Sequence, residues 1–442
     1  MSSRWTEVTL RSVAEVIMGQ SPPGSTYNEE GDGLPFFQGV KDFNYRHPTT
    51  RVYCSAPSRI AQPGDILLSV RAPIGQVNVA DRVCAIGRGL SIIRARNPRD
   101  CRFIEFVLRF LEPSWHAIEG TGSVFGNATK KDLESLILPW PPERERHAIG
   151  HILGTLDDKI ELLRRMNETL EAMAQALFKS WFVDFDPVID NALEAGNPIP
   201  DQLKGKAKRR LALGNKRKPL PKHIRRLFPD RFIASELGPI PAGWGIRSLD
   251  EIAEYLNGVA WQKYRAKEGE PSLPVIKIRE LREGITPASD RASLDVPEEY
   301  IVEDGDVLFS WSGSLLVKIW CGGQGILNQH LFKVSSKHYP KWFYYLWTSE
   351  HLDRFQRIAA DKATTMGHIK RSHLSESYVL VPNSTLLGKM TTIIEPLVEK
   401  QIANKIACRT LANIRDALLP KLISGEIRVE NAEEFLEERG PC

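Results

Sequence analysis

The sequence predicts an α+β protein in which two similar mixed domains are separated by two long antiparallel coiled-coil helices. Three observations predict this fold. Two stretches of the chain match each other, each leads into a heptad pattern of apolar residues, and each combines short β-rich runs with many Gly and Pro turns. At 442 residues the chain is also too long for one ordinary core.

The internal repeat consists of four short segments of the first copy that match four segments of the second copy in the same order. We call these matching segments islands. The offset between the copies is 239 positions for the first two islands and 241 for the last two. A nearly constant offset predicts a duplicated domain of about 150 residues. The matching islands are 5–19 with 244–258, Leu34-Pro35 with Leu273-Pro274, 63–69 with 304–310, and Gly126 and Leu133 with Gly367 and Leu374.

Each copy ends in a predicted helix with heptad spacing. A lone Asn in the first seam is the kind of buried polar residue that fixes register when it has a partner. Since each helix belongs to one copy of a duplication, we expect the two to pack antiparallel. The seams are Ile149, Leu153, Leu156, Ile160, Leu163, Asn167, Leu170, Ala174, Leu177 and Trp181, and then Ile394, Leu397, Gln401, Asn404, Cys408, Leu411, Arg415, Leu418 and Leu422.

The predicted helices set a length scale. About 35 residues at roughly 1.5 Å each give a rod of about 50 Å, and one turn of B-DNA is about 34 Å. Domains near the two ends of such a rod would reach successive stretches of groove on one face of a duplex. The heptads alone also allow a helical bundle core or a homodimerising coiled coil.

The expected boundaries follow from these patterns, with amphipathic helices expected at 101–111 and 341–355 inside the mixed domains. The predicted order is a first mixed domain at 1–143, a spacer helix at 144–184, a basic linker at 185–238, a second mixed domain at 239–385, a second spacer helix at 386–424, and a C-terminal tail at 425–442.

Bulk composition narrows the class of protein. Hydrophobic residues make up 42% of the chain and charged residues 26%, which is typical of a soluble globular protein. No run approaches the roughly 18 apolar residues that a spanning helix needs, and the N-terminus lacks the apolar segment of a signal peptide. The six cysteines are far apart with no C-x-x-C pair. A cytoplasmic protein without a zinc knuckle or disulfide framework is expected.

Positive charge is concentrated in one segment. Twelve Lys or Arg lie between Lys204 and Arg231, against one acid, Asp230, although the net charge of the whole chain is only +4. The remainder of the chain is therefore acidic overall. Attraction to nucleic acid by bulk charge would come from this segment, while a solvated linker is an equally good interpretation.

Motifs for catalysis are largely missing. The segment at 203–210 has a Gly-Lys without the earlier glycine or the Ser/Thr of a phosphate loop, and the segment at 140–143 lacks the Asn/Asp and trailing aromatic of a base methyltransferase motif. Asp157-Asp158-Lys159 has the letters of a nuclease motif but falls on a predicted solvated face of the coiled coil. His147 and His151 are four apart without a third ligand, so no metal site is predicted.

Side chains suited to DNA binding stand in Gly-rich turns of both copies. Glycine lets a backbone approach a groove closely, and Arg or Gln side chains read guanine or adenine edges. Each turn alone is more often structural, but the recurrence favours a shared role. The candidate DNA-binding residues are Gln38, Lys41, Arg71, Arg88, Thr121, Ser123, Lys130, Lys277, Arg279, Ser312, Ser314, Gln329, His330, Thr364, Thr365 and Lys370.

Three strings carry a family resemblance. The segment at 141–188 closely resembles the central spacer of the DNA specificity subunit of type I restriction-modification systems. The segments FPDRFIASELGPIPAGW at 228–244 and IRDALLPKLISGEI at 414–427 are similar to the entry of that family's second domain and to its C-terminal helix. The likeness spans essentially the whole chain and includes the duplicated layout.

The resemblance implies a non-catalytic subunit with two target recognition domains, each reading one half of a split, asymmetric double-stranded DNA site. It also implies two methyltransferase subunits and two translocase-nuclease (restriction) subunits as partners. S-adenosylmethionine, ATP and Mg would then act on those partners and not on this chain. The basic run departs from the usual short connection of the family. A coiled-coil adaptor without DNA specificity, or a nuclease or methyltransferase, stays open as an alternative function.

Overall fold

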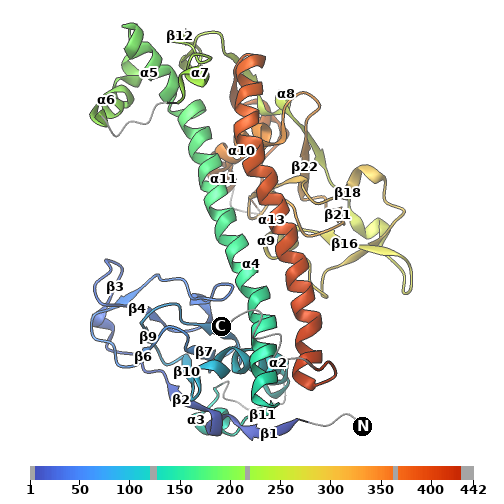
Figure 1. Cartoon of the computed structure of the whole chain (residues 1–442). Coiled ribbons are helices and arrows are strands. Elements are labelled where there is room, and N and C mark those ends of the chain that lie inside the picture. Colours follow the sequence, from blue (N-terminus) through green and yellow to red (C-terminus); the bar gives the residue numbers. More distant parts are fainter. Residues whose placement is uncertain (1–4, 120–126, 215–219, 362–366, 430–442) are drawn as a thin grey trace. The chain divides into compact units, whose positions relative to one another are not determined.

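The computed structural model describes residues 5–119, 127–214, 220–361 and 367–429. These residues form two compact units. Unit 1 comprises the chain up to Leu162 together with the residues from Thr410 onward, and unit 2 comprises Leu163–Arg409. Two long helices contribute to both units (Figure 1).

The α-helices of the described residues are two long ones, α4 (Glu143–Phe178) and α13 (Ser384–Ser424), and a set of shorter ones. The shorter helices are α1 (Leu10–Val13), α2 (Cys101–Glu119), α3 (Lys130–Glu134), α5 (Asp186–Ala195), α6 (Lys204–Ala212), α7 (Lys222–Arg225), α8 (Leu249–Ile252), α9 (Ile278–Glu283), α10 (Lys341–Glu350), α11 (Leu352–Ala360) and α12 (Arg371–Ser375).

The strands are short throughout. Unit 1 contains β1 (Thr6–Thr9), β2 (Ala14–Met18), β3 (Tyr27–Asn28), β4 (Leu34–Phe37), β5 (Tyr53–Cys54), β6 (Ile60–Ala61), β7 (Ile66–Ser69), β8 (Val77–Val79), β9 (Cys84–Ile86), β10 (Leu90–Ala95) and β11 (Ile137–Trp140). Unit 2 contains β12 (Phe232–Ser235), β13 (Gly238–Pro241), β14 (Gly245–Ser248), β15 (Glu254–Asn257), β16 (Ser272–Ile276), β17 (Arg291–Ser293), β18 (Ile301–Val302), β19 (Val307–Ser310), β20 (Val317–Ile319), β21 (Gly325–Leu327), β22 (Leu331–Ser335) and β23 (Tyr378–Val381).

The two units share one sheet plan. The antiparallel sheet β2-β10-β7-β8 of unit 1 has its counterpart in β15-β22-β19-β20 of unit 2. The second sheet is β3-β5-β4-β9-β6 in unit 1 and β17-β16-β21-β18 in unit 2, and each holds one parallel pair, β4 with β9 and β16 with β21. The short pairs β1-β11 and β14-β23 also correspond. The predicted duplication of a mixed α+β domain is confirmed.

The central strands explain why both domains are mixed. All four residues of β7 are buried, and so are all four of β19. Because successive side chains of a strand point to opposite faces, Ile66 and Leu68 pack in one apolar cluster with α2, whereas Leu67 packs in another with the second sheet. A four-residue strand that is covered on both faces therefore appears in the sequence as a continuous apolar run.

The long helices have the predicted seam. Every position of the first seam is buried or half-buried, and α4 begins at Glu143 directly after two prolines, which favour a helix start. In unit 2, Asn404 Nδ2 donates to Asn167 Oδ1 at 3.0 Å. In unit 1, Arg415 pairs with Asp157. In unit 2 the C-terminal part of α4 thus meets the N-terminal part of α13. In unit 1 the N-terminal part of α4 meets the C-terminal part of α13, as in an antiparallel pair.

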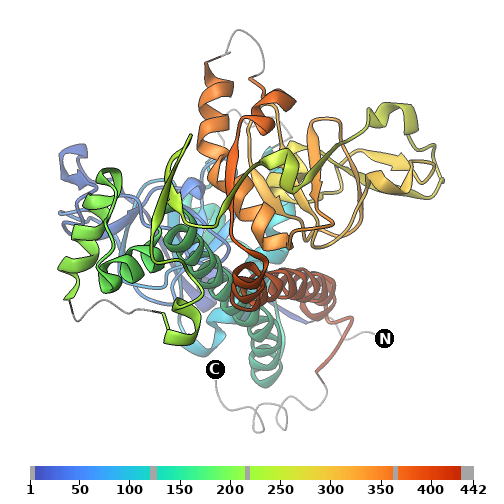
Figure 2. The same ribbon diagram turned by 90° about the horizontal axis from the view of Figure 1, so that it is seen from above.

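In its described residues, the segment predicted as a basic linker is folded and belongs to unit 2. Its helices α5, α6 and α7 gather around the C-terminal end of α4, and the hairpin β12-β13 follows them (Figures 1 and 2). Trp181 packs edge-to-face on Phe228 at 5.9 Å, which fastens the segment to the end of α4. The sequence did not predict these short amphipathic helices, because runs of Lys and Arg leave few apolar positions to mark their buried sides.

In the described part of the chain, no helix combines the length and the apolar character that crossing a membrane requires.

Candidate nucleic-acid interface

In unit 1, three turns meet where the strands of the two sheets end. Strands β4 and β9 are parallel and end together, with Phe37 opposite Ile86. Gln38 and Gly87, the next residue of each strand, therefore lie side by side, and Gly87 N donates to the carbonyl of Phe37 at 2.8 Å. The turn that carries Arg88 is thus anchored beside Gln38.

The third turn follows β7. Ser69 is the last residue of β7 and lies opposite Leu90, the first residue of β10. Just beyond this pair, Val70 N donates to the Gly89 carbonyl at 3.0 Å, and Arg71 forms an isolated bridge with Asn127. Arg71 and Arg88 consequently leave adjacent turns, and both are exposed.

The glycines of these turns serve internal packing. A Cβ on Gly89 would come within 2.1 Å of the Gln38 carbonyl oxygen, and one on Gly19 within 2.2 Å of the Gly87 carbonyl oxygen. In unit 2 a Cβ on Gly258 would come within 2.3 Å of the Asn328 carbonyl oxygen. Gly19 and Gly258 are matching residues of the repeat, so their role here is to let neighbouring backbones touch.

Unit 2 builds the same arrangement with different side chains. Ile276 and Leu327 end the parallel pair β16 and β21 together, and Lys277 follows the first of them. Asn328 N donates to the Ile276 carbonyl at 3.2 Å, and Ser312 forms an isolated bridge with His368 at the position where Arg71 pairs with Asn127 in unit 1.

The side chains of this second cluster are already engaged, either with one another or with neighbouring residues. Ser312 is 3% exposed, and its Oγ lies 3.1 Å from Nδ1 of His330. Nε2 of Gln329 lies 3.4 Å from Nε2 of His330. The Lys277 ammonium pairs with Asp290 and lies 5.0 Å from the centre of the Trp261 ring. The buried Ser312 therefore helps to fix the orientation of the His330 imidazole.

The remaining described candidates lie two or three residues further along the chain from these turns, and two of them have local partners. Lys41 is exposed in the short turn after Gln38, Lys130 pairs with Glu134 at 3.6 Å, and Arg279 pairs with Glu280 at 2.7 Å. Ser314 and Lys370 are exposed. Thr121, Ser123, Thr364 and Thr365 lie outside the described residues.

Sequence reasoning missed an aromatic residue in the second cluster. Trp311 directly precedes Ser312 and is half-buried, and its ring centre lies 5.7 Å from that of His330. Its Nε1 donates to Asn257 Oδ1 at 2.9 Å. The sequence contained a signal for this residue. A Trp that directly follows an apolar four-residue strand lies at the end of that strand, where the sheet no longer covers it.

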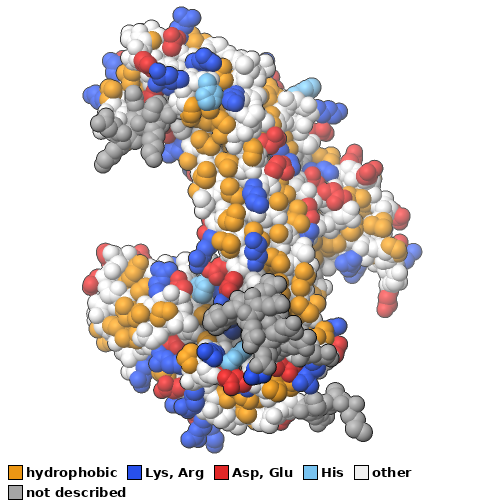
Figure 3. Space-filling view, viewed as in Figure 1, with side chains coloured by type: hydrophobic (Ala, Val, Ile, Leu, Met, Phe, Trp, Pro, Cys, Tyr) orange, Lys and Arg blue, Asp and Glu red, His pale blue; other side chains and the backbone are white. Residues whose placement is uncertain are grey.

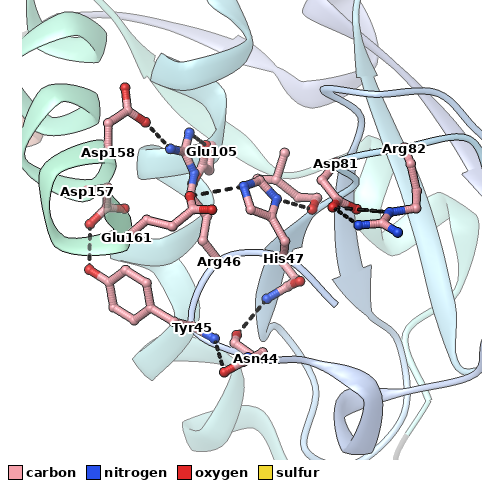
Figure 4. Close-up of polar contacts among 12 residues, drawn as sticks. Asn44, Tyr45, Arg46, His47, Asp81, Arg82, Glu105, Asp157, Asp158 and Glu161 are labelled. Atoms are coloured by element: carbon pink, nitrogen blue, oxygen red, sulfur yellow. Dashed lines mark hydrogen bonds and ion pairs between the residues drawn. The ribbon is translucent and has the colours of Figure 1, made fainter. Parts of the chain in front are cut away.

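Charged groups hold the loop between β4 and β5 against the long helix α4 (Figure 4). Tyr45 OH donates to Asp157 Oδ1 at 2.9 Å. Arg46 pairs with Asp158 of α4 and also lies 3.6 Å from Glu105 of α2. This loop begins at Gln38, so the network ties the chain that leaves one of the three turns to the helices of unit 1.

Asp157 is the centre of this network, and the expectation of a solvated helix face at 157–159 is wrong for it. The residue is 0% exposed, 2.7 Å from Arg109 and 2.6 Å from Arg415. Burial alone would raise the pKa of Asp157, but the two guanidinium groups and the hydrogen bonds from Arg415 and Tyr45 hold it below its usual range. Its partners are distant in the sequence, so no local sequence pattern predicted these ion pairs.

No metal centre emerges in the described part of the chain. Among these residues no three His, Cys, Asp or Glu side chains are placed to share a metal ion. His147 lies 3.2 Å from Asp100 through its Nε2, and that carboxylate also receives Arg146. What the clusters offer chemically is a set of hydrogen-bond donors and acceptors on rigid turns.

Comparisons with known proteins point to one family. The model of the type I restriction modification DNA specificity domain matches residues 2–172 and 241–407. The MjaX specificity subunit of a type I restriction enzyme from Methanocaldococcus jannaschii is 43% identical over 158 residues, which span 36% of this chain and 37% of that relative. The MjaIX specificity subunit of the same organism is 24% identical over 96% of this chain and 94% of its own length.

A solved structure agrees at the level of the fold. The crystal structure of the S subunit of a type I restriction-modification system from M. genitalium aligns with a TM-score of 0.55 over 95% of this chain and 96% of that chain, at 16% identity. The family model covers both copies of the repeat and more than half of the sequence. The protein therefore belongs to the type I restriction-modification DNA specificity family.

Proposed function

We propose that this DNA specificity chain reads a bipartite, asymmetric site on double-stranded DNA, with one half read by each copy of the repeat. The observation that carries the proposal is the pair of equivalent turn clusters. Their backbones correspond, but Gln38, Arg71 and Arg88 of unit 1 are replaced by Lys277, Ser312 and Gln329 in unit 2. One scaffold with two sets of side chains would read two different half-sites.

The chemistry of these side chains fits base reading. An exposed Arg such as Arg88 presents two parallel N–H groups that match guanine O6 and N7, and a Gln such as Gln329 matches adenine N6 and N7. Lys side chains at the rim, such as Lys41, suit phosphate oxygens, which set position and affinity and carry no sequence information. Each unit would thus combine one or two forked readers with several phosphate contacts.

The division of labour with partner subunits is part of the proposal. The chain would carry no catalytic activity itself and would direct two methyltransferase subunits and two restriction subunits to the site. S-adenosylmethionine, ATP and Mg would act on those partners, and the complex would work in the cytoplasm. The names of the relatives, which are specificity subunits of type I restriction enzymes, support this assignment.

The adaptor alternative has less support. A coiled-coil adaptor without DNA specificity would need only the long helices, whereas the family match extends over the sheets of both repeats. An adaptor would also have no use for two turn clusters that share a backbone and differ in their polar side chains.

The experiment is to co-express the chain with its methyltransferase partner and to map methylated adenines across the host genome. A single split motif with a constant gap is the expected result. Exchange of residues 1–140 for those of a relative with another target should then change only one half of the motif. A soluble, intact complex that produces no motif would overturn the proposal and favour the adaptor.

A further inference from the structure

The folded segment after α4 carries more positive charge than its own acids can neutralise. We call residues 184–214 and 220–231 the basic insert, which is the part of this segment that the structure describes. It contains nine Lys or Arg and six Asp or Glu, so its formal charge is +3. None of its residues is among the predicted base-reading turns, and the proposed function gives it no role.

Five of the six acids are engaged inside the insert. Arg210 lies 3.6 Å from Asp186 and also pairs with Asp190, and Arg225 pairs with Glu194. The remaining ion pairs are Lys206 with Asp184 at 3.2 Å and Lys204 with Asp201 at 2.6 Å. These pairs hold the short helices together, so the acids are committed to the fold of the insert.

Five bases of the described insert remain exposed outside these ion pairs, namely Arg231 just before β12 and four on or beside the short helices. Lys208 and Arg209 are exposed on α6, whose buried side is formed by Ala207. Lys222 and Arg226 are exposed four residues apart on and just after α7. For these four side chains the described part of the chain provides no ion pair. Figure 3 shows Lys and Arg side chains at the surface over α5, α6 and α7.

The excess positive charge of this surface favours a polyanion as its binding partner. Unneutralised cations close together repel one another, and a bound anionic partner removes that repulsion. Protein interfaces are depleted of Lys and of charged residues at their centres, whereas Lys and Arg side chains are usual partners of phosphate oxygens. The surface therefore fits a phosphate backbone better than it fits a protein.

We propose that the basic insert binds the phosphate backbone of double-stranded DNA without reading its sequence, as a third contact besides the two reading clusters. The inference rests on the proposed DNA-reading function and adds to it. Each phosphate contact contributes about 0.9 to the slope of log K against log salt. The insert should raise affinity for target and non-target DNA by the same factor, leaving their ratio unchanged.

The test compares charge-removal variants in the complex of this chain with its methyltransferase partner. The variant is K208Q/R209Q/K222Q/R226Q, with K208Q/R209Q as a milder version. The control is R247Q/K337Q, which removes two exposed bases of unit 2 outside the insert. Affinity for a target duplex and a non-target duplex is measured between about 50 and 200 mM salt, and thermal unfolding reports whether the insert stays folded.

The expected result is a salt slope reduced by about 0.9 for every lost phosphate contact, an equal loss of affinity for both duplexes, and an unchanged methylation motif. An unchanged slope in a complex that still methylates its motif would overturn the inference while leaving the proposed function intact. Loss of the methyltransferase subunit from the variant, but not from the control, would also overturn it and assign the surface to a protein. Absence of any split motif in the wild type would instead refute the proposed function.

Discussion

Asp157 of α4 and Arg415 of α13 form an ion pair of 2.6 Å in the interior of unit 1, where Asp157 is fully buried. The repeat places Val398 and Ala174 at the equivalent positions of unit 2, 241 residues away in each case, and both are buried in one apolar cluster. The same contact between α4 and α13 is therefore made by charged side chains in unit 1 and by apolar side chains in unit 2.

We expect Arg415→Ala to destabilise unit 1 by about 3–5 kcal/mol, because it leaves the buried Asp157 carboxylate with too few partners. Hydrogen exchange of unit 1 amides measures this loss separately from unit 2. The double variant D157V/R415A reproduces the apolar pair of unit 2, and Arg109 keeps Glu105 as a partner at 2.7 Å. It should recover most of the stability, and a double variant as unstable as R415A would contradict this account.

The same pair predicts acid sensitivity. The pKa of Asp157 is lowered in the folded protein, so its contribution to stability is present above the unfolded value of about 3.9 and is lost as pH falls through the folded value. We therefore expect protection of unit 1 to decrease below about pH 4. The D157V/R415A variant should lack this part of the decrease, and identical pH profiles for the two proteins would refute the assignment.

The seam amides of unit 2 provide a second test of the helix pairing. Asn404 Nδ2 donates to Asn167 Oδ1 at 3.0 Å, and both residues are buried. Asn167→Leu should cost about 1–3 kcal/mol, because it leaves the Asn404 amide buried and unsatisfied. N167L/N404L should cost much less, and a double-mutant cycle in denaturant measures the coupling. Additive losses would show that the two amides do not depend on each other.

The fold could be predicted from the sequence because its signals are periodic or repeated. The seam from Ile149 to Trp181 and the matched runs at 63–69 and 304–310 carry structure in local patterns. Asp157 could not be predicted, since its partners Arg109 and Arg415 are 48 and 258 residues away and only the folded chain brings them together. The candidate turns were found by their composition, but Ser312 shows that a polar residue in a turn is not always exposed.

Base reading by the two clusters is tested most directly at Arg88 and Gln329, which hold equivalent positions two residues after β9 and β21. Arg88→Ala should relax one base in one half of the methylation motif and reduce target affinity by about 1–3 kcal/mol, roughly 5- to 150-fold. Gln329→Ala should act on the other half only. Non-target affinity should change little, because the lost contacts are to bases and not to phosphates.

Arg82 provides the matched control for Arg88. It is also an exposed arginine of unit 1, but its guanidinium pairs with Asp81 at 2.6 Å and it lies outside the cluster of turns. Arg82→Ala should leave the motif and the target affinity unchanged. Because R88A and R82A remove the same charge, a difference between them isolates base contact from bulk electrostatics. Equal effects of the two variants, or a change in both halves of the motif from Arg88→Ala alone, would mean that the cluster does not read one half-site.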